Sequence, residues 1–204
     1  MHRSLGLDFG TTNTALARAG EHGDTELAEF QAASGPTPAF RSLLFVGLDE
    51  GGKQRVTAGP QAIADELSID WDGRLIQSLK SFLASRSFTS TVIFGRSYAL
   101  EDLVGHLLRR VREAAEEQWG ELGSRAVVGR PVRFVGSDGP EDDERAVARL
   151  EAALAKAGFT EVSFEPEPLA AAWELIVLCQ IVGGFDHAGD DAKALYRLAH
   201  QAAA

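Results

Sequence analysis

The stretch Leu-Gly-Leu-Asp-Phe-Gly-Thr-Thr-Asn-Thr, residues 5–14, places one carboxylate at the end of an apolar strand and follows it with glycine and small polar residues. An apolar run resumes at Ala15, so the pattern predicts two strands joined by a tight turn. Gly10 has no Cβ, which lets the backbone approach a ligand closely. The successive amides of Thr11, Thr12 and Asn13 could form an anion-binding concavity. The turn is therefore predicted to hold phosphate groups.

Asp8 by itself would oppose such binding. Two unit negative charges about 4 Å apart repel by roughly 4 kcal/mol at an effective dielectric near 20. A Mg²⁺ ion between the carboxylate and the phosphate reverses that sign. Because Mg²⁺ gives up its water reluctantly, we expect Asp8 to face the metal through water. The alternative is a plain hairpin turn capped by the side chains of Asp8 and Asn13.

Composition limits the class of protein. The chain has 204 residues, 45% of them hydrophobic, which is enough for one globular domain with a smaller insertion. The net charge of -10 argues against nucleic acid and against an anionic membrane as partners. One cysteine excludes an internal disulfide, and no apolar run approaches the roughly 20 residues of a membrane span. We expect a cytoplasmic protein with no leader sequence.

Hydrophobic periodicity predicts a chain of strands and helices. Strands are expected as a pair over residues 4–18 and then over 26–30, 43–48, 55–58, 125–135 and 160–164. Helices are expected over residues 61–67, 74–83, 100–119, 140–156 and 168–175. Residues 33–38, which contain two prolines and a glycine, are predicted to break regular structure. From residue 125 onward the order of elements predicts a βαβ unit with parallel strands.

Lys80 falls within the expected helix 74–83. Helical spacing would put Lys80 outside the apolar face of that helix. The apolar face would consist of Leu75, Leu79, Phe82 and Leu83.

Four segments occur in an order seen in the actin-like ATPase superfamily. They are Asp-Phe-Gly-Thr-Thr-Asn (8–13), Ser-Leu-Lys-Ser-Phe-Leu (78–83), Val-Gly-Arg-Pro-Val-Arg-Phe (128–134) and Glu-Pro-Glu-Pro-Leu-Ala-Ala-Ala (165–172). Over about residues 4–175 the chain resembles the first lobe of the seventy-kilodalton heat-shock chaperone (heat shock protein 70-like) family. The resemblance is to the short bacterial branch that lacks a peptide-binding domain.

The resemblance implies a fold. It is an α/β, ribonuclease H-like actin-type ATPase lobe, with a mixed five-stranded sheet, flanking helices and a small inserted α+β subdomain. Residues 1–36 and 120–175 would form the ATPase subdomain with its phosphate turn and βαβ unit. Residues 37–119 would form the insertion and a connecting helix, and 176–204 a divergent tail.

The resemblance also implies a site for ATP with Mg²⁺. Asp8 would face the hydrated metal, and the backbone from Gly10 through Thr11 and Thr12 to Asn13 would hold the β- and γ-phosphates. Lys80 would contact the γ-phosphate and orient the attacking water, and Glu167 would lie near the water shell of the metal. The alternatives are an ordinary exposed helix lysine and an acid favoured by a helix dipole.

After Trp173 the sequence departs from the family pattern. Relatives continue into a second phosphate loop, Asp-x-Gly-Gly-Gly-Thr, and a second lobe that holds the adenosine, and we expect neither here. Such a truncated lobe is expected to bind ATP weakly, at millimolar strength or below detection, with turnover near background. Two alternatives are a non-catalytic interaction module, bound by another protein chain at the surface left bare, and a bacterial actin-like protein.

Overall fold

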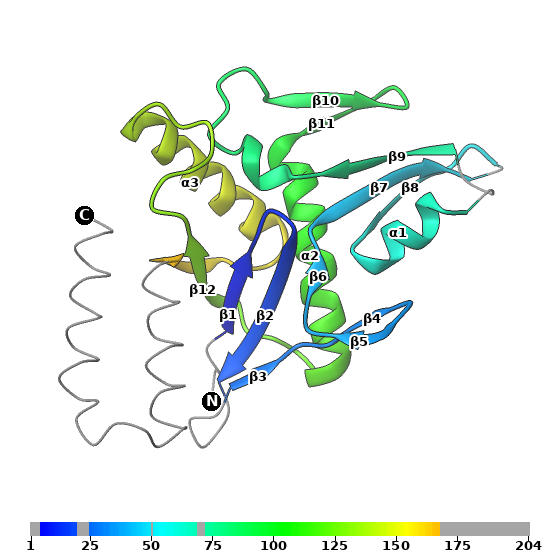
Figure 1. Ribbon diagram of the computed structural model, residues 1–204, viewed down its shortest axis with the longest axis horizontal. Coiled ribbons are helices and arrows are strands. Elements are labelled where there is room, and N and C mark those ends of the chain that lie inside the picture. Colours follow the sequence, from blue (N-terminus) through cyan, green and yellow to red (C-terminus); the bar gives the residue numbers. More distant parts are fainter. Residues whose placement is uncertain (1–4, 20–24, 50, 69–71, 168–204) are drawn as a thin grey trace.

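The chain folds as a mixed α/β protein in which a mixed sheet packs against two long helices (Figure 1). The structure, a computed structural model, describes residues 5–19, 25–49, 51–68 and 72–167. The helices are α1 (Pro60–Glu66), α2 (Leu100–Trp119), α3 (Pro140–Lys156) and the short 3₁₀ helix η1 (Leu79–Phe82). The strands are β1 (Leu5–Phe9), β2 (Asn13–Ala19), β3 (Thr25–Leu27), β4 (Phe30–Ala32), β5 (Gly35–Thr37), β6 (Phe40–Arg41), β7 (Leu43–Leu48), β8 (Gln54–Ala58), β9 (Asp72–Gln77), β10 (Ser90–Ile93), β11 (Arg96–Ala99), β12 (Arg125–Arg130) and β13 (Glu161–Pro166).

The main sheet has the strand order β13-β12-β1-β2-β3, and β6 adds to β2 beyond that path. β12 runs parallel to both of its neighbours, β1 and β13, while β2 is antiparallel to β1, β3 and β6. The parallel βαβ unit β12-α3-β13 is therefore confirmed. The expected five-stranded sheet is wrong by one strand, because Phe40 and Arg41 continue the ladder beside Thr14 and Asn13.

One face of this sheet carries the core. Side chains alternate along a strand, so Leu5, Leu7 and Phe9 of β1 are buried while Asp8 is exposed on the other face. The buried side of β1 packs in one hydrophobic cluster with the predicted apolar stripe of α2 and with buried residues of α3. Burial on one face thus fixes the register that presents Asp8 on the other.

The remaining elements lie between β3 and β12 in sequence. A three-stranded antiparallel sheet of order β8-β7-β9 packs beside α1, and β4–β5 and β10–β11 form separate hairpins. β6, which falls inside the range 37–119, pairs with the main sheet, and the division of the chain into subdomains stays a prediction. The expected helix at 168–175 and the tail 176–204 lie outside the described residues.

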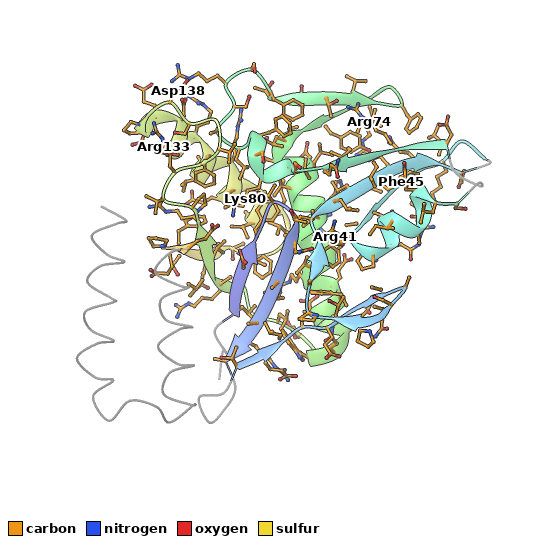
Figure 2. The ribbon with its side chains drawn as sticks, in the orientation of Figure 1. Arg41, Phe45, Arg74, Lys80, Arg133 and Asp138 are labelled. Carbon is orange, nitrogen blue, oxygen red and sulfur yellow. The ribbon has the colours of Figure 1, made fainter. Side chains whose placement is uncertain are left out.

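The expected helix over residues 74–83 is wrong. Its first half is strand β9, in which Leu75 lies opposite Phe45 of β7, and its second half is the short helix η1. Gly73 allows this pairing, because a Cβ there would come within 1.9 Å of the Phe45 ring. Figure 2 labels Phe45 of β7 and Arg74 of β9, which lies opposite Val46. The apolar spacing of this segment fitted a helix, but pairing with β7 overrode it.

Two smaller expectations also need correction. Residues 33–38 do not break regular structure throughout, since Gly35–Thr37 forms β5 and pairs with β4. The strand expected to reach residue 135 ends at Arg130, directly before Pro131, which has no amide to continue a ladder.

Of the helices in the described ranges, none is both long and apolar enough to cross a membrane.

Candidate functional site

The turn between β1 and β2 is closed by its own backbone. The amide of Gly10 donates a hydrogen bond of 3.0 Å to the carbonyl of Asn13. A Cβ on Gly10 would lie 2.3 Å from that carbonyl oxygen, closer than atoms can approach. The glycine is thus required by the turn itself, a reason that differs from the ligand approach on which the sequence prediction rested.

Hydrogen bonds from Arg41 of β6 and from the next residue, Ser42, hold the turn against the protein. The amide of Ser42 donates to the carbonyl of Thr12 at 2.8 Å, and Arg41 donates to Oδ1 of Asn13 at 3.1 Å. Thr11 and Thr12 are exposed. Within the part of the chain that the structure describes, no group accepts a hydrogen bond from the amide of either threonine. The carbonyl of Thr12 and the side chain of Asn13 are therefore held by the protein, whereas the amides of Thr11 and Thr12 are available to a ligand.

Asp8 and Glu167 lie on either side of a glycine in the neighbouring strand. The parallel register of β1 and β12 places Asp8 opposite Gly129. A Cβ built on Gly129 would lie 4.0 Å from Oδ1 of Asp8 and 3.5 Å from Cγ of Glu167, which follows the end of β13. The missing side chain of Gly129 leaves room between the two acidic residues.

Lys80 completes the group. Its Nζ donates to Oε1 of Glu167 as an ion pair, although 87 residues separate the two in sequence. The Lys80 side chain is 10% exposed and that of Glu167 is 39% exposed. Lys80 is therefore not the exposed helix lysine of the alternative reading; it lies at the centre of the view in Figure 2, in the helix η1. Ser78, two residues before Lys80, has a left-handed backbone with φ of 60°, and this conformation turns the chain from β9 into η1.

The arrangement brings together all the residues singled out in the sequence. The carboxylates of Asp8 and Glu167 and the cation of Lys80 lie at the end of β1 and β12, and the turn that follows β1 begins at this same end. Among the described residues, no three or more His, Cys, Asp or Glu side chains gather as direct ligands of a metal ion. Two carboxylates suit Mg²⁺ held largely by water and phosphate oxygens, which is how this ion usually binds beside a nucleotide.

A second set of side chains, missed in the sequence, fixes the segment that carries Lys80. Arg149 of α3 donates to the carbonyls of Leu83 at 3.0 Å and Ser85 at 2.8 Å. Asp142, in the first turn of α3, accepts from Arg86 at 2.7 Å and from Arg145 at 2.5 Å. These two arginines hold the pKa of the Asp142 carboxyl well below its usual range. Only the packing of α3 against residues 82–86 reveals this support, because no sequence spacing links them.

A comparison of the sequence with models of known protein families finds no match. The resemblance to the chaperone family therefore stays a prediction from the four motifs.

Proposed function

We propose that this chain is an ATP-binding lobe of a chaperone-like ATPase of the actin-like superfamily. The observation that carries the proposal is that Asp8 and Glu167 lie beside Gly129 and that Lys80 pairs with Glu167. These residues come from β1, from η1 and from the end of β13, so their meeting depends on the whole fold. If the ion pair between Lys80 and Glu167 served only to stabilise the fold, there would be no reason for Asp8 and the turn after β1 to lie beside it.

Each part of the site has a role in this proposal. The amides of Thr11 and Thr12, which donate to no described group, would donate to phosphate oxygens, as a backbone concavity does for anions. Asp8 and Glu167 would hold the water shell of Mg²⁺, which supplies positive charge against the phosphates when it is bound. Lys80 would direct its ammonium toward the terminal phosphate and offset negative charge there. The low exposure of Lys80 strengthens such a charge interaction, because less water screens it.

The finer fold assignment belongs to the same proposal. A sheet in which an antiparallel hairpin adjoins a parallel βαβ unit is compatible with a ribonuclease H-like actin-type lobe. The order β13-β12-β1-β2 places the phosphate turn and the end of β13 at the same end of the sheet. That placement supports a nucleotide site rather than a structural role for either segment.

The expected affinity for ATP is low. The contacts described above reach only phosphate and metal, and phosphate contacts alone rarely hold a nucleotide tightly. We therefore propose millimolar binding of Mg·ATP by this chain in isolation, with little hydrolysis. A titration must reach millimolar ligand to detect it.

Nuclear magnetic resonance of the ¹⁵N-labelled chain provides the test. Mg·ATP at millimolar concentration should shift the amides of Thr11 and Thr12 more than those of the β10–β11 hairpin. Asp8→Asn should weaken this response about tenfold, since it removes one charged contact to the metal shell. Arg110→Gln changes an exposed arginine of α2, the helix that packs on the face of the sheet opposite Asp8; it is the matched control and should leave the response unchanged. Unshifted turn amides, or an unchanged response in Asp8→Asn, would overturn the proposal.

A further inference from the structure

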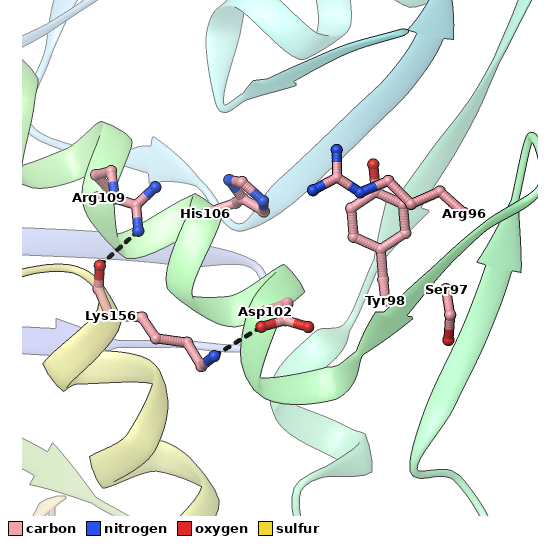
Figure 3. A pocket seen from close by; sticks show the side chains of 7 residues that line it. All are labelled: Arg96, Ser97, Tyr98, Asp102, His106, Arg109 and Lys156. Atoms are coloured by element: carbon pink, nitrogen blue, oxygen red, sulfur yellow. Dashed lines mark hydrogen bonds and ion pairs between the residues drawn. The ribbon is translucent and has the colours of Figure 1, made fainter.

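A second polar pocket lies away from the residues discussed so far. It has a volume of about 210 Å³ and opens between the β10–β11 hairpin, the first half of α2 and the last residue of α3, Lys156 (Figure 3). Asp142 and Lys156 lie at opposite ends of α3, so the pocket is far from the Asp142 cluster. Five of its lining residues carry an acidic or basic side chain: Arg96, Asp102, His106, Arg109 and Lys156.

Positive charge dominates this pocket, in a chain whose net charge is -10. Its one carboxylate is already engaged, because Asp102 accepts from Nζ of Lys156 at 2.8 Å and from the amide of Ala99 at 3.0 Å. Arg109 donates to the backbone carbonyl of Lys156 at 2.6 Å, a bond that leaves the charge of its guanidinium unpaired. Three cations thus face one carboxylate.

Arg96, the third of these cations, has no anionic partner among the described residues. Its guanidinium lies 5.3 Å from the centre of the Tyr98 ring, which orients it toward the pocket (Figure 3). In the described part of the chain no carboxylate forms an ion pair with Arg96, and none does so with Arg109. Two guanidinium groups from separate elements therefore lie on one pocket, and no carboxylate of the described ranges serves either as a counter-ion.

His106 lies between these cations as a neutral group. Burial lowers the pKa of His106, and the charges of Arg109, Arg96 and Lys156 lower it further, against the opposing effect of Asp102. Its neutral ring leaves a hydrogen-bond donor and an acceptor beside the arginines at neutral pH. An anion in the pocket would stabilise the protonated ring and supply the missing negative charge.

The close approach of α2 and α3 builds the pocket wall. A Cβ on Gly105 would lie 3.0 Å from Cβ of Lys156 and 3.3 Å from the carbonyl oxygen of Ala153. The missing side chain at Gly105 lets the end of α3 reach α2. This contact holds the Lys156 ammonium beside Asp102 and its carbonyl beside Arg109.

We propose that this pocket binds a phosphate group, as inorganic phosphate or as a phosphomonoester. Three cations facing one carboxylate leave an excess of two positive charges, which a phosphate dianion balances and an acetate-like anion does not. Guanidinium forks match phosphate oxygens with paired hydrogen bonds, and two such forks are present here. The volume suits one such group with its nearest substituent and is too small for a whole nucleotide.

The test follows the imidazole of His106 by nuclear magnetic resonance, with its signal assigned from the variant His106→Gln. Inorganic phosphate and O-phosphoserine are titrated separately, with acetate as a third ligand at matched ionic strength. Phosphate should raise the pKa of His106 by about 1, and acetate should leave it unchanged. A response to phosphoserine as well as to phosphate would indicate a site for phosphomonoesters. A response to phosphate alone would restrict the site to the free ion.

Two variants separate binding from general charge effects. Arg96→Gln should weaken phosphate binding about tenfold, the loss expected for one charge-assisted hydrogen bond. Arg133→Gln carries the same charge change outside the pocket and should bind phosphate as the unmodified chain does. If phosphate leaves His106 unchanged, if acetate acts as phosphate does, or if the two variants behave alike, the proposal is wrong. None of these outcomes depends on ATP binding.

Discussion

Arg86 donates a hydrogen bond of 2.7 Å to Oδ1 of Asp142, across 56 residues of sequence. This contact ties the chain just after η1 to the first turn of α3, and Arg145, which donates to the same oxygen, also donates to the carbonyl of Ala84 at 3.2 Å. The segment so held directly follows η1, the helix that carries Lys80. Charged groups outside the candidate site therefore support the segment that positions Lys80.

Asp142 is expected to make stability depend on acid pH. The pKa of Asp142 in the folded chain lies below its ordinary value of 3.8, so its contribution is complete above that value and is lost as the pH falls further. Asp142→Asn should lower the urea midpoint at pH 7, and the difference from the unmodified chain should shrink below pH 4. A constant difference across this range would contradict the assigned pairing.

Gly129 is expected to govern access to the space between Asp8 and Glu167. Gly129→Val fills that space with a side chain that strands accept well, and should abolish the response of the turn to Mg·ATP while the chain remains folded. Gly129→Ala adds one carbon at ordinary contact distance and should retain most of the response. Nucleotide titration of both variants, with circular dichroism as the check of folding, compares them. Equal responses in the two variants would show that the space is not used.

Gly10 is expected to be needed for stability as well as binding. Gly10→Ala places a carbon 2.3 Å from the carbonyl of Asn13, so the turn must open, at a cost of about 1–3 kcal/mol in the free energy of unfolding. Gly6→Ala in β1, the strand before this turn, is the matched control, because nothing lies within 4 Å of its added carbon. Urea unfolding of the two variants should separate them clearly, and similar losses would refute the steric argument.

Arg149 is expected to position the segment that carries Lys80. Its guanidinium binds backbone carbonyls after η1 and forms an ion pair with Glu101 at 3.2 Å, with the side chain 12% exposed. Arg149→Met should cost about 1–3 kcal/mol in the free energy of unfolding, since the carbonyls lose their donor. Arg149→Lys should recover only part of this loss, because an ammonium lacks the planar fork of donors with which one guanidinium reaches several carbonyls. Full rescue by lysine would show that charge alone matters.

His106 is expected to weaken the fold on mild acidification. Its pKa is lowered in the folded chain from an ordinary value of 6.5, so the unfolded chain binds a proton first as the pH falls. Stability should therefore be constant above pH 6.5 and decline below it, and His106→Gln should flatten this decline. Unfolding midpoints between pH 5 and pH 8 provide the measurement. A steeper decline in the variant would mean that the shift has the opposite sign.

The sequence predicted secondary structure most reliably where the residues of one short segment were sufficient to specify it. The apolar stripe of α2 predicted its length and its buried face, and Pro140 with the acids after it predicted the start of α3. The β1–β2 hairpin followed from its glycine and small polar residues. The segment from Asp72 to Phe82 failed, because strand and helix both fit its apolar residues and the choice was made by β7.

By itself, the sequence determined which side chains could serve a phosphate site, since the Asp8 strand, the Gly10 turn, Lys80 and Glu167 each stand in a local pattern. Only the tertiary structure decided that Lys80 and Glu167 pair across 87 residues and that Gly129 leaves room beside Asp8. The physical reason is that strand order, register and helix packing set distances between segments. Those distances depend on the burial of a shared core, which no single segment encodes.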